Sequence, residues 1–172
     1  CGEKTIWERD TASLPLGAVR LTEGFLVSDP PTDQEWERLQ RHLRSTLEVG
    51  LNGAPFRSLP ETDQARGEAP LVVGVGGTAT SLAAMDQALP VYRREKVHGY
   101  RLPAESIARW AHRLRKMPLA ERQQVSGLQP QRAAVAPAGA AILAAALAFI
   151  GAESLVVSEF DLLEGILATI DP

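Results

Sequence analysis

Cysteine, histidine and aromatic residues are scarce in this chain of 172 residues. It contains 1 cysteine, 3 histidines and 5% aromatic residues. A single cysteine cannot form an internal disulfide, and no charged leader precedes an apolar core and cleavage site, so we expect a protein of the reducing cytoplasm. No histidine has a cysteine or a second histidine at metal-ligand spacing, which argues against a metal site built on these residues.

An excess of basic charge is also missing. Lys and Arg number 18 against 21 Asp and Glu, for a formal net charge of −3. Without a basic surface to neutralise phosphates, we do not expect nucleic acid as a partner. The one long uncharged run, residues 133–152, is 11 alanines in 20 residues interrupted by Pro137 and Gly139. It lacks basic or aromatic anchors, so it predicts a buried helix of small residues capped by Gly151, not a membrane span.

The composition of the whole chain, 45% hydrophobic and 23% charged, is typical of a folded protein, and its length is that of one domain. Hydrophobic periodicity predicts an α/β domain whose mixed sheet carries helices on both faces. Residues 5–17 predict two short strands joined by a tight turn, and residues 71–75 and 154–158 predict strands buried on both faces. We expect helices over residues 18–26, 32–50, 79–86, 103–116, 118–126 and 133–152 and from Asp161. We also expect an exposed loop over 52–69 and an irregular or weakly extended segment over 91–102.

The clearest helix start lies at Thr32-Asp33-Gln34-Glu35. These four residues match a capping box, in which the threonine hydroxyl and the glutamate side chain satisfy free backbone amides of the first turn. Apolar residues then recur at steps of three and four as far as Gly50. This pattern predicts an amphipathic helix.

Gly76 and Gly77 stand between a predicted strand and a predicted helix. Glycines let the backbone approach a ligand closely, and the free amides at a helix start favour an anion. Thr78 and Thr80 add hydroxyl donors. A tight turn that needs glycine only for its backbone angles is an equally good interpretation of this segment.

The same segment formally matches the dinucleotide fingerprint, with Gly74, Gly76 and Ala79 at the required spacing and Glu95 at the distance of a ribose ligand. In that motif, however, the acidic residue ends a second buried strand, whereas Glu95 lies in a charged stretch. A domain that binds a nicotinamide dinucleotide is therefore a minor alternative.

Three further side chains could contact a ligand. Glu159 directly follows the last predicted strand, where functional carboxylates often lie, although it could instead cap the next helix. Arg122 and Arg132 flank a turn at Gly127, and either guanidinium could neutralise a phosphate.

The remaining candidates have simpler interpretations. His98 is expected to be a structural hydrogen-bonding residue, and His42 and His112 are expected to be solvated on helix faces. Ser13 and Ser158 have no base at a fixed spacing, which gives no support for a nucleophilic triad.

Six segments, in this order and at suitable spacing, resemble the exopolyphosphatase and guanosine pentaphosphate phosphohydrolase (Ppx/GppA) family. They span nearly the whole chain, which makes the resemblance specific although each motif alone is modest. The segments are SLPLGAVRLTE at 13–23, VGGTATS at 75–81, KVHGYRL at 96–102, ER at 121–122 with GLQPQR at 127–132, PAGAAIL at 137–143, and VSE at 157–159 with EGIL at 164–167.

The resemblance implies a ribonuclease-H-like fold, related to actin, the sugar kinases and the heat-shock chaperones, in which two domains enclose a phosphate-binding cleft. Residues 1–172 then form a single domain, the second of the two. We expect the first domain, and the first strand of the second domain with its phosphate loop, to precede Cys1. Without that strand, the sheet should show a gap, an altered pairing or a strand from another copy in a homodimer.

The resemblance also implies a phosphoanhydride hydrolase that releases terminal phosphate from inorganic polyphosphate or guanosine pentaphosphate. The catalytic glutamate is expected in the first domain, with Mg²⁺ as the divalent metal, so this chain alone should be inactive. Gly76, Gly77, Thr78 and Ala79 correspond to the family's second glycine turn.

For the phosphate or nucleotide ligand, the resemblance adds Arg122, Arg132 and Glu159 as binding residues. Leu163 stands where relatives often carry an arginine, so any role of that arginine is missing here. The expected partners are polyphosphate or guanosine penta- or tetraphosphate and the protein's own N-terminal domain, with no membrane. A non-catalytic binding module on the same fold is the main alternative, and a kinase related to the sugar or acetate kinases is a nearer competitor by fold.

Overall fold

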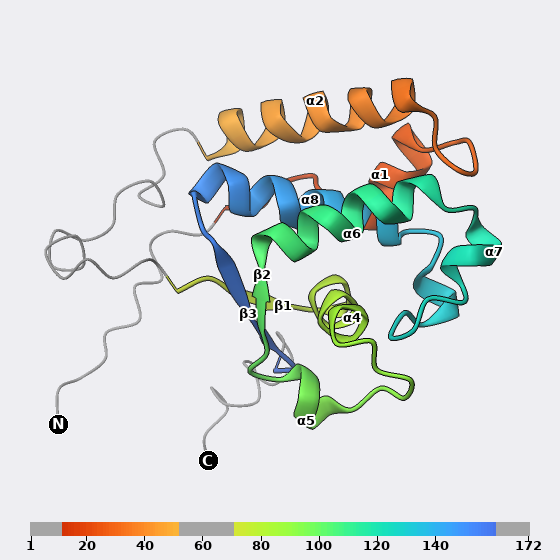
Figure 1. Ribbon diagram of the computed structural model, residues 1–172. Helices are drawn as coiled ribbons and strands as arrows, with labels where there is room; N and C mark the ends of the chain where they lie inside the picture. Colours follow the sequence, from red (N-terminus) through yellow and green to blue (C-terminus); the bar gives the residue numbers. More distant parts are fainter. Residues whose placement is uncertain (1–11, 52–70, 161–172) are drawn as a thin grey trace, which may run out of the picture.

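The computed structural model describes residues 12–51 and 71–160, which form helices around a small mixed sheet (Figure 1). The first range holds α1 (Ala18–Phe25) and α2 (Asp33–Gly50). The second range holds β1 (Val73–Val75), α4 (Gly77–Asp86), α5 (Arg94–Val97), β2 (Arg101–Pro103), α6 (Ala104–Lys116), α7 (Leu119–Arg122), the 3₁₀ helix η2 (Pro130–Arg132), α8 (Ala136–Ile150) and β3 (Ser154–Ser158). The predicted strand over residues 5–11, the loop over 52–69 and the helix from Asp161 lie outside the described residues.

The sheet has the order β1-β3-β2, with β3 in the centre. β1 runs parallel to β3, with Gly74 opposite Val157, and β2 runs antiparallel to it, with Leu102 opposite Leu155. The prediction of a mixed sheet is therefore confirmed. The parallel pair places the carboxyl ends of β1 and β3 side by side, so the residues that follow Val75 and Ser158 lie at one edge.

One face of the sheet is covered by helices within the described residues. Leu102, Leu155 and Val157 point into the core formed with α4, α6 and α8. On the other face Val73 and Val75 are 53% and 56% exposed, so the prediction that residues 71–75 are buried on both faces is wrong. The physical reason is that side chains alternate along a strand, so only the central residue of β1, Gly74, faces the helical core, and Val73 and Val75 point to the opposite face.

The uncharged helix α8 lies between two groups of helices. This position explains why it consists mostly of small residues. Figure 1 shows α8 between α2 and α6, and it packs against α6 on one side and α1 and α2 on the other. Its small side chains serve both sides, since Ala140 belongs to the core with the sheet and Ala138 and Ala141 to the core with α1 and α2. Gly151, at a φ of 76°, ends α8 as predicted. None of the helices in the described ranges is long and apolar enough to cross a membrane.

α8 also touches the start of α4. A Cβ atom placed on Gly139 would lie 2.8 Å from Oγ1 and 2.9 Å from Cγ2 of Thr78, closer than ordinary contacts allow. The glycine therefore lets the first turn of α4 approach the α8 backbone. This contact fixes where the glycine turn before α4 lies relative to the rest of the domain.

Two segments differ from their predictions. Residues 12–17 contain no strand, because Pro15 has no amide to donate and the Leu16 amide bonds the Leu14 carbonyl at 2.8 Å, which bends the chain locally. Residues 91–102, predicted to be irregular or weakly extended, include the one-turn helix α5, which was not predicted, and end in the extended strand β2. β2 forms because β3 offers it a partner, with Val157 N donating to Tyr100 O at 2.9 Å.

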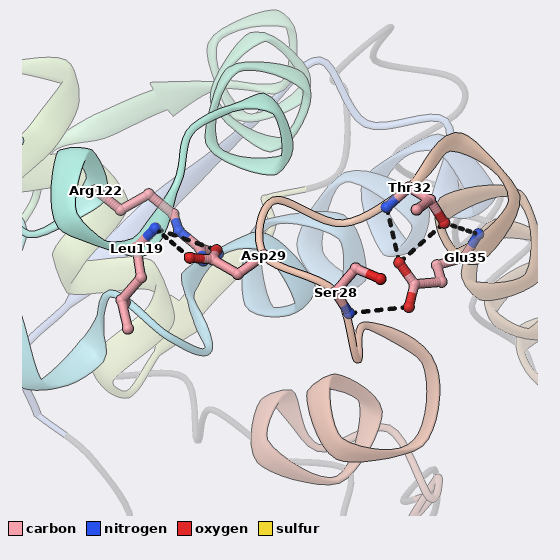
Figure 2. A network of polar contacts seen from close by, with 6 residues as sticks. All are labelled: Ser28, Asp29, Thr32, Glu35, Leu119 and Arg122. Carbon is pink, nitrogen blue, oxygen red and sulfur yellow. Dashed lines mark hydrogen bonds and ion pairs between the residues drawn. The ribbon is translucent and has the colours of Figure 1, made fainter.

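The capping box at the start of α2 is confirmed and extends into a larger network (Figure 2). The Glu35 carboxylate accepts hydrogen bonds from the Thr32 amide at 2.7 Å, the Thr32 hydroxyl at 2.9 Å, and the Val27 and Ser28 amides at 3.0 Å each. The hydrogen bond from the Thr32 amide, followed by those from Ser28 and the Thr32 hydroxyl, outweighs partial burial and lowers the pKa of Glu35 to about 2.

Asp29 lies in the same connection and reaches α7 (Figure 2). Its carboxylate accepts the Leu119 amide at 2.8 Å and pairs with the Arg122 guanidinium, whose side chain is 5% exposed. Asp29 thus caps α7 and neutralises a buried arginine. Together, Asp29 and Glu35 tie the α1–α2 connection to the segment that leads into η2.

The contact between α8 and α4 predicts that Gly139→Ala destabilises the protein. Overpacking costs about 1–3 kcal/mol and alanine's helix preference returns up to about 1 kcal/mol, so we expect a net loss of about 1–2 kcal/mol by urea unfolding. Gly24→Ala in α1 is the matched control, because nothing lies within 4 Å of the added Cβ. Equal stability changes in the two variants would contradict the close contact.

The Glu35 network predicts a stability loss that depends on pH. Because the folded pKa lies below the ordinary value, the ionised carboxylate stabilises the fold above about pH 4.5, and this stabilisation is lost as the pH falls through about 2. Glu35→Gln should therefore cost about 1–2 kcal/mol at pH 7. Urea unfolding of both proteins across this range should show the gap closing toward pH 2, and a gap that does not depend on pH would disprove the role of the charge.

Candidate functional site

An open groove of about 280 Å³ lies at the edge of the sheet where β1 and β3 end. We call it the glycine-turn groove. It combines residues of the α4 start, the loop before α5, the η2 region and the end of β3. The lining residues are Gly76, Gly77, Thr80, Tyr92, Gln129, Arg132, Ser158 and Glu159.

The glycine turn forms the floor of the groove. Gly76 adopts a φ of 81°, a left-handed conformation that disfavours residues with a Cβ, and acts as the N-cap of α4. Its carbonyl accepts the Thr80 amide at 3.2 Å. The amides of Gly77, Thr78 and Ala79 belong to the first turn, which has no intrahelical acceptors, so this end of α4 favours negative charge.

Arg132 lies directly on the glycine turn. A Cβ atom at Gly77 would lie 1.5 Å from Nη1 of Arg132, so the guanidinium occupies the space that a side chain would fill. The Arg132 Nε donates to Oε1 of Gln129 at 3.0 Å, which orients the guanidinium. Arg132 thus brings a positive charge beside the amides of the α4 start.

Glu159 and Tyr92 form another wall of the groove. The Tyr92 hydroxyl donates to Oε1 of Glu159, although 67 residues separate them. Burial, and then the bond to Glu159, raise the pKa of Tyr92 to about 12, so the phenol stays protonated and neutral. The Glu159 amide donates to Nδ1 of His98 at 3.2 Å, and this confirms His98 as a structural hydrogen-bonding residue.

The structure brings most of the predicted site residues together. For two of them only the backbone, and not the side chain, belongs to the site. Gly76, Gly77, Arg132 and Glu159 line the groove. The side chain of Thr78 instead packs against Gly139 of α8, and only its backbone belongs to the glycine turn. The Ala79 side chain is buried in the core, so it too offers the groove its amide alone.

Arg122 does not line this groove. Its side chain is buried and forms an ion pair with Asp29. Burial lowers the pKa of Arg122, and the charge of Asp29 opposes that shift. The prediction that Arg122 binds phosphate therefore finds no support in its position.

The dinucleotide interpretation also finds no support. Glu95 is exposed on α5 and does not end a strand, whereas the fingerprint requires an acidic residue at a strand end. Ser158 bonds the backbone of Phe160 through its hydroxyl. His112 is exposed as predicted, and His42 stacks on Phe25 with ring centroids 4.7 Å apart.

The donor set of the groove does not by itself fit a resident metal ion. Among the described residues, no group of three or more His, Cys, Asp or Glu side chains is arranged to hold one. Glu159 is the single carboxylate in the groove. A divalent cation bound here would need ligands from a substrate or from elsewhere in the protein.

Sequence reasoning missed Tyr92 and Gln129 as site residues. Tyr92 lies in a loop without periodicity and reaches the groove through a partner 67 residues away, which no local pattern reveals. Gln129 lies between the two candidate arginines. Its role depends on the orientation of Arg132 toward Gly77, which the sequence does not reveal. Both residues act by orienting a charged neighbour.

Comparisons with known proteins agree on one family. The model of the Ppx/GppA phosphatase family matches residues 6–171. The chain is 34% identical to Exopolyphosphatase 2 of Mycobacterium tuberculosis, covering 90% of this chain and 46% of that protein. It is 30% identical to Exopolyphosphatase 1 of Mycobacterium leprae, covering 90% of this chain and 43% of that protein. The chain thus spans less than half the length of these relatives.

Solved structures show the same likeness. A Ppx/GppA enzyme of Aquifex aeolicus matches with a TM-score of 0.76 and 32% identity, covering 94% of this chain and 49% of its own. An exopolyphosphatase-like protein matches with a TM-score of 0.79 and 27% identity, covering 90% and 48%. A family match over nearly the whole sequence, joined to this fold and its glycine turn, shows that the chain belongs to the Ppx/GppA phosphatase family.

Proposed function

We propose that the whole protein is a phosphoanhydride hydrolase that releases terminal phosphate from inorganic polyphosphate or guanosine pentaphosphate. Relatives named exopolyphosphatase support the reaction class. The chain would form the second of two ribonuclease-H-like domains, and its glycine-turn groove would face a cleft shared with the protein's own N-terminal domain. Its length, about half that of the matching structures, agrees with one domain of two.

The observation that carries this proposal is the position of Arg132 over Gly77. A guanidinium and the free amides of a helix start converge on one groove, and both favour an anion. Phosphoryl oxygens accept such hydrogen bonds, and the charge that develops on them during transfer is stabilised by fixed donors. Gly77, Thr80 and Arg132 would therefore bind and orient a terminal phosphate.

The chemistry of bond cleavage would lie outside these residues. We propose that a glutamate of the first domain activates the attacking water, so that the chain alone is inactive. Mg²⁺ would supply charge neutralisation of the phosphates when bound. The described residues of this chain do not form a complete set of metal ligands, so their part is to hold the phosphate.

A second candidate, a phosphate- or nucleotide-binding module without turnover, is favoured by one observation. The described residues place a single carboxylate in the groove, and one of its oxygens already accepts the Tyr92 hydroxyl. Binding of tripolyphosphate without phosphate release by the full-length protein would support this candidate over a hydrolase.

Phosphate release from polyphosphate and from guanosine pentaphosphate by the full-length protein tests the proposed reaction. Gly77→Ala should lower phosphate release at least about tenfold, because the new Cβ displaces Arg132 and a lost charged hydrogen bond costs about 1.5–3 kcal/mol. Gly24→Ala, far from any contact, should leave the rate unchanged. No release of phosphate from either substrate by the full-length protein would reject the hydrolase.

The two arginines should respond in opposite ways. Arg132→Met should weaken tripolyphosphate binding to the full-length protein roughly tenfold or more, with little change in stability, because Arg132 is exposed. Arg122→Met should leave binding unchanged and cost about 1–2 kcal/mol, because it breaks a partly buried ion pair. Calorimetric titration and urea unfolding measure both effects, and weaker binding in the Arg122 variant alone would contradict this assignment.

A further inference from the structure

The glycine-turn groove contains two opposite charges that do not pair with each other. Arg132 and Glu159 both line it, and Glu159 is its single acidic side chain. Oppositely charged side chains that share a groove attract each other. Among the ion pairs of the described residues, however, none joins Arg132 to Glu159. Each charge is therefore held apart from the other by its own surroundings.

Arg132 is held on the side of the glycine turn. Its Nε donates to Oε1 of Gln129 at 3.0 Å, and its guanidinium lies over Gly77. Within residues 12–51 and 71–160, the terminal nitrogens Nη1 and Nη2 donate to no protein group. These nitrogens therefore remain available for the paired hydrogen bonds that a guanidinium makes to a phosphate.

Glu159 is held by Tyr92. The Tyr92 hydroxyl donates to Oε1 of the carboxylate, and the Glu159 amide donates to Nδ1 of His98 at 3.2 Å. Because burial and the bond to Glu159 raise the pKa of Tyr92 to about 12, the phenol keeps the proton that it donates at neutral pH. His98 thus fixes the backbone of Glu159, and Tyr92 is the one described residue whose hydrogen bond fixes the carboxylate.

We propose that Tyr92 keeps the groove open to phosphate by holding Glu159 away from Arg132. The proposal rests on the proposed function, in that Arg132 binds phosphate. Without the Tyr92 hydroxyl, the Glu159 carboxylate can turn within the groove and pair with Arg132. A phosphate then binds only to the fraction of molecules in which this ion pair is broken. Tyr92 is a positioning residue, because it acts on the phosphate through Glu159 and Arg132.

Titration of tripolyphosphate into the full-length protein tests this role. Tyr92→Phe removes one oxygen atom and should weaken binding roughly two- to fivefold, the effect of a competing ion pair at a partly exposed site. Glu159→Gln removes the competing charge, so Tyr92→Phe added to it should cause no further loss of affinity. Rescue in the double variant distinguishes the release of Glu159 from a general change in the shape of the groove, which would weaken binding in both backgrounds.

Tyr100→Phe is the matched control. The Tyr100 hydroxyl donates to Oδ2 of Asp86 at 2.8 Å, so this change also removes a hydrogen bond between a tyrosine and a carboxylate. Neither Tyr100 nor Asp86 lines the groove. Tyr100→Phe should therefore bind tripolyphosphate as the unaltered protein does, and an equal loss of affinity in the two tyrosine variants would overturn the proposal.

Arg132→Met separates this role from the proposed function. If Arg132→Met weakens binding but Tyr92→Phe does not, or if Tyr92→Phe weakens binding equally with and without Glu159→Gln, the positioning role is overturned and the phosphate site remains. If Arg132→Met leaves binding unchanged, the groove is not the phosphate site, and the proposed function fails together with the role of Tyr92. Tyr92→Leu removes the same donor and provides the measurement if the phenylalanine variant does not fold.

Discussion

The start of α4 makes two close contacts, each at a glycine where a Cβ atom would not fit. Arg132 fills the space over Gly77 on one side, and Thr78 presses against Gly139 of α8 on the other. Because residues 77 in α4 and 139 in α8 are both glycine, the first turn of α4 can contact α8 and the Arg132 guanidinium at the same time. The contact with α8 holds the first turn of α4 in place, and the contact with Arg132 brings a positive charge beside its amides.

The charged network around α2 supports the same region from a distance. Asp29 caps α7, and the chain then runs through Gly127 to η2 and Arg132. Glu35 holds the connection that carries Asp29 (Figure 2). The two carboxylates differ in surroundings, since Glu35 accepts only neutral donors while Asp29 balances the buried charge of Arg122. An anchored α7 gives the η2 segment a fixed starting point.

Much of this arrangement could be predicted from sequence, because local signals determine it. The Thr32 capping box, the left-handed Gly151 and the glycine turn each depend on a few neighbouring residues, and the structure has them as expected. Features that depend on distant partners could not be predicted. Val73 is exposed because it points to the sheet face opposite the helical core, and the roles of Arg122 and Arg132 diverge because Asp29 neutralises one of them. Burial and pairing, not residue type, decide between two such arginines.

The groove draws its walls from segments that are far apart in the chain. The contact between Tyr92 and Glu159 closes a loop of 67 residues, and Arg132 reaches back to Gly77 past α5, β2, α6 and α7. Contacts of high sequence separation form late, because the entropy of closing a long loop is lost before the contact is made. Local helices such as α2 can form early, whereas the groove can exist only after β3 has joined the sheet. A chain interrupted during synthesis before Ser154 would therefore carry the glycine turn without the wall that gives the groove its shape.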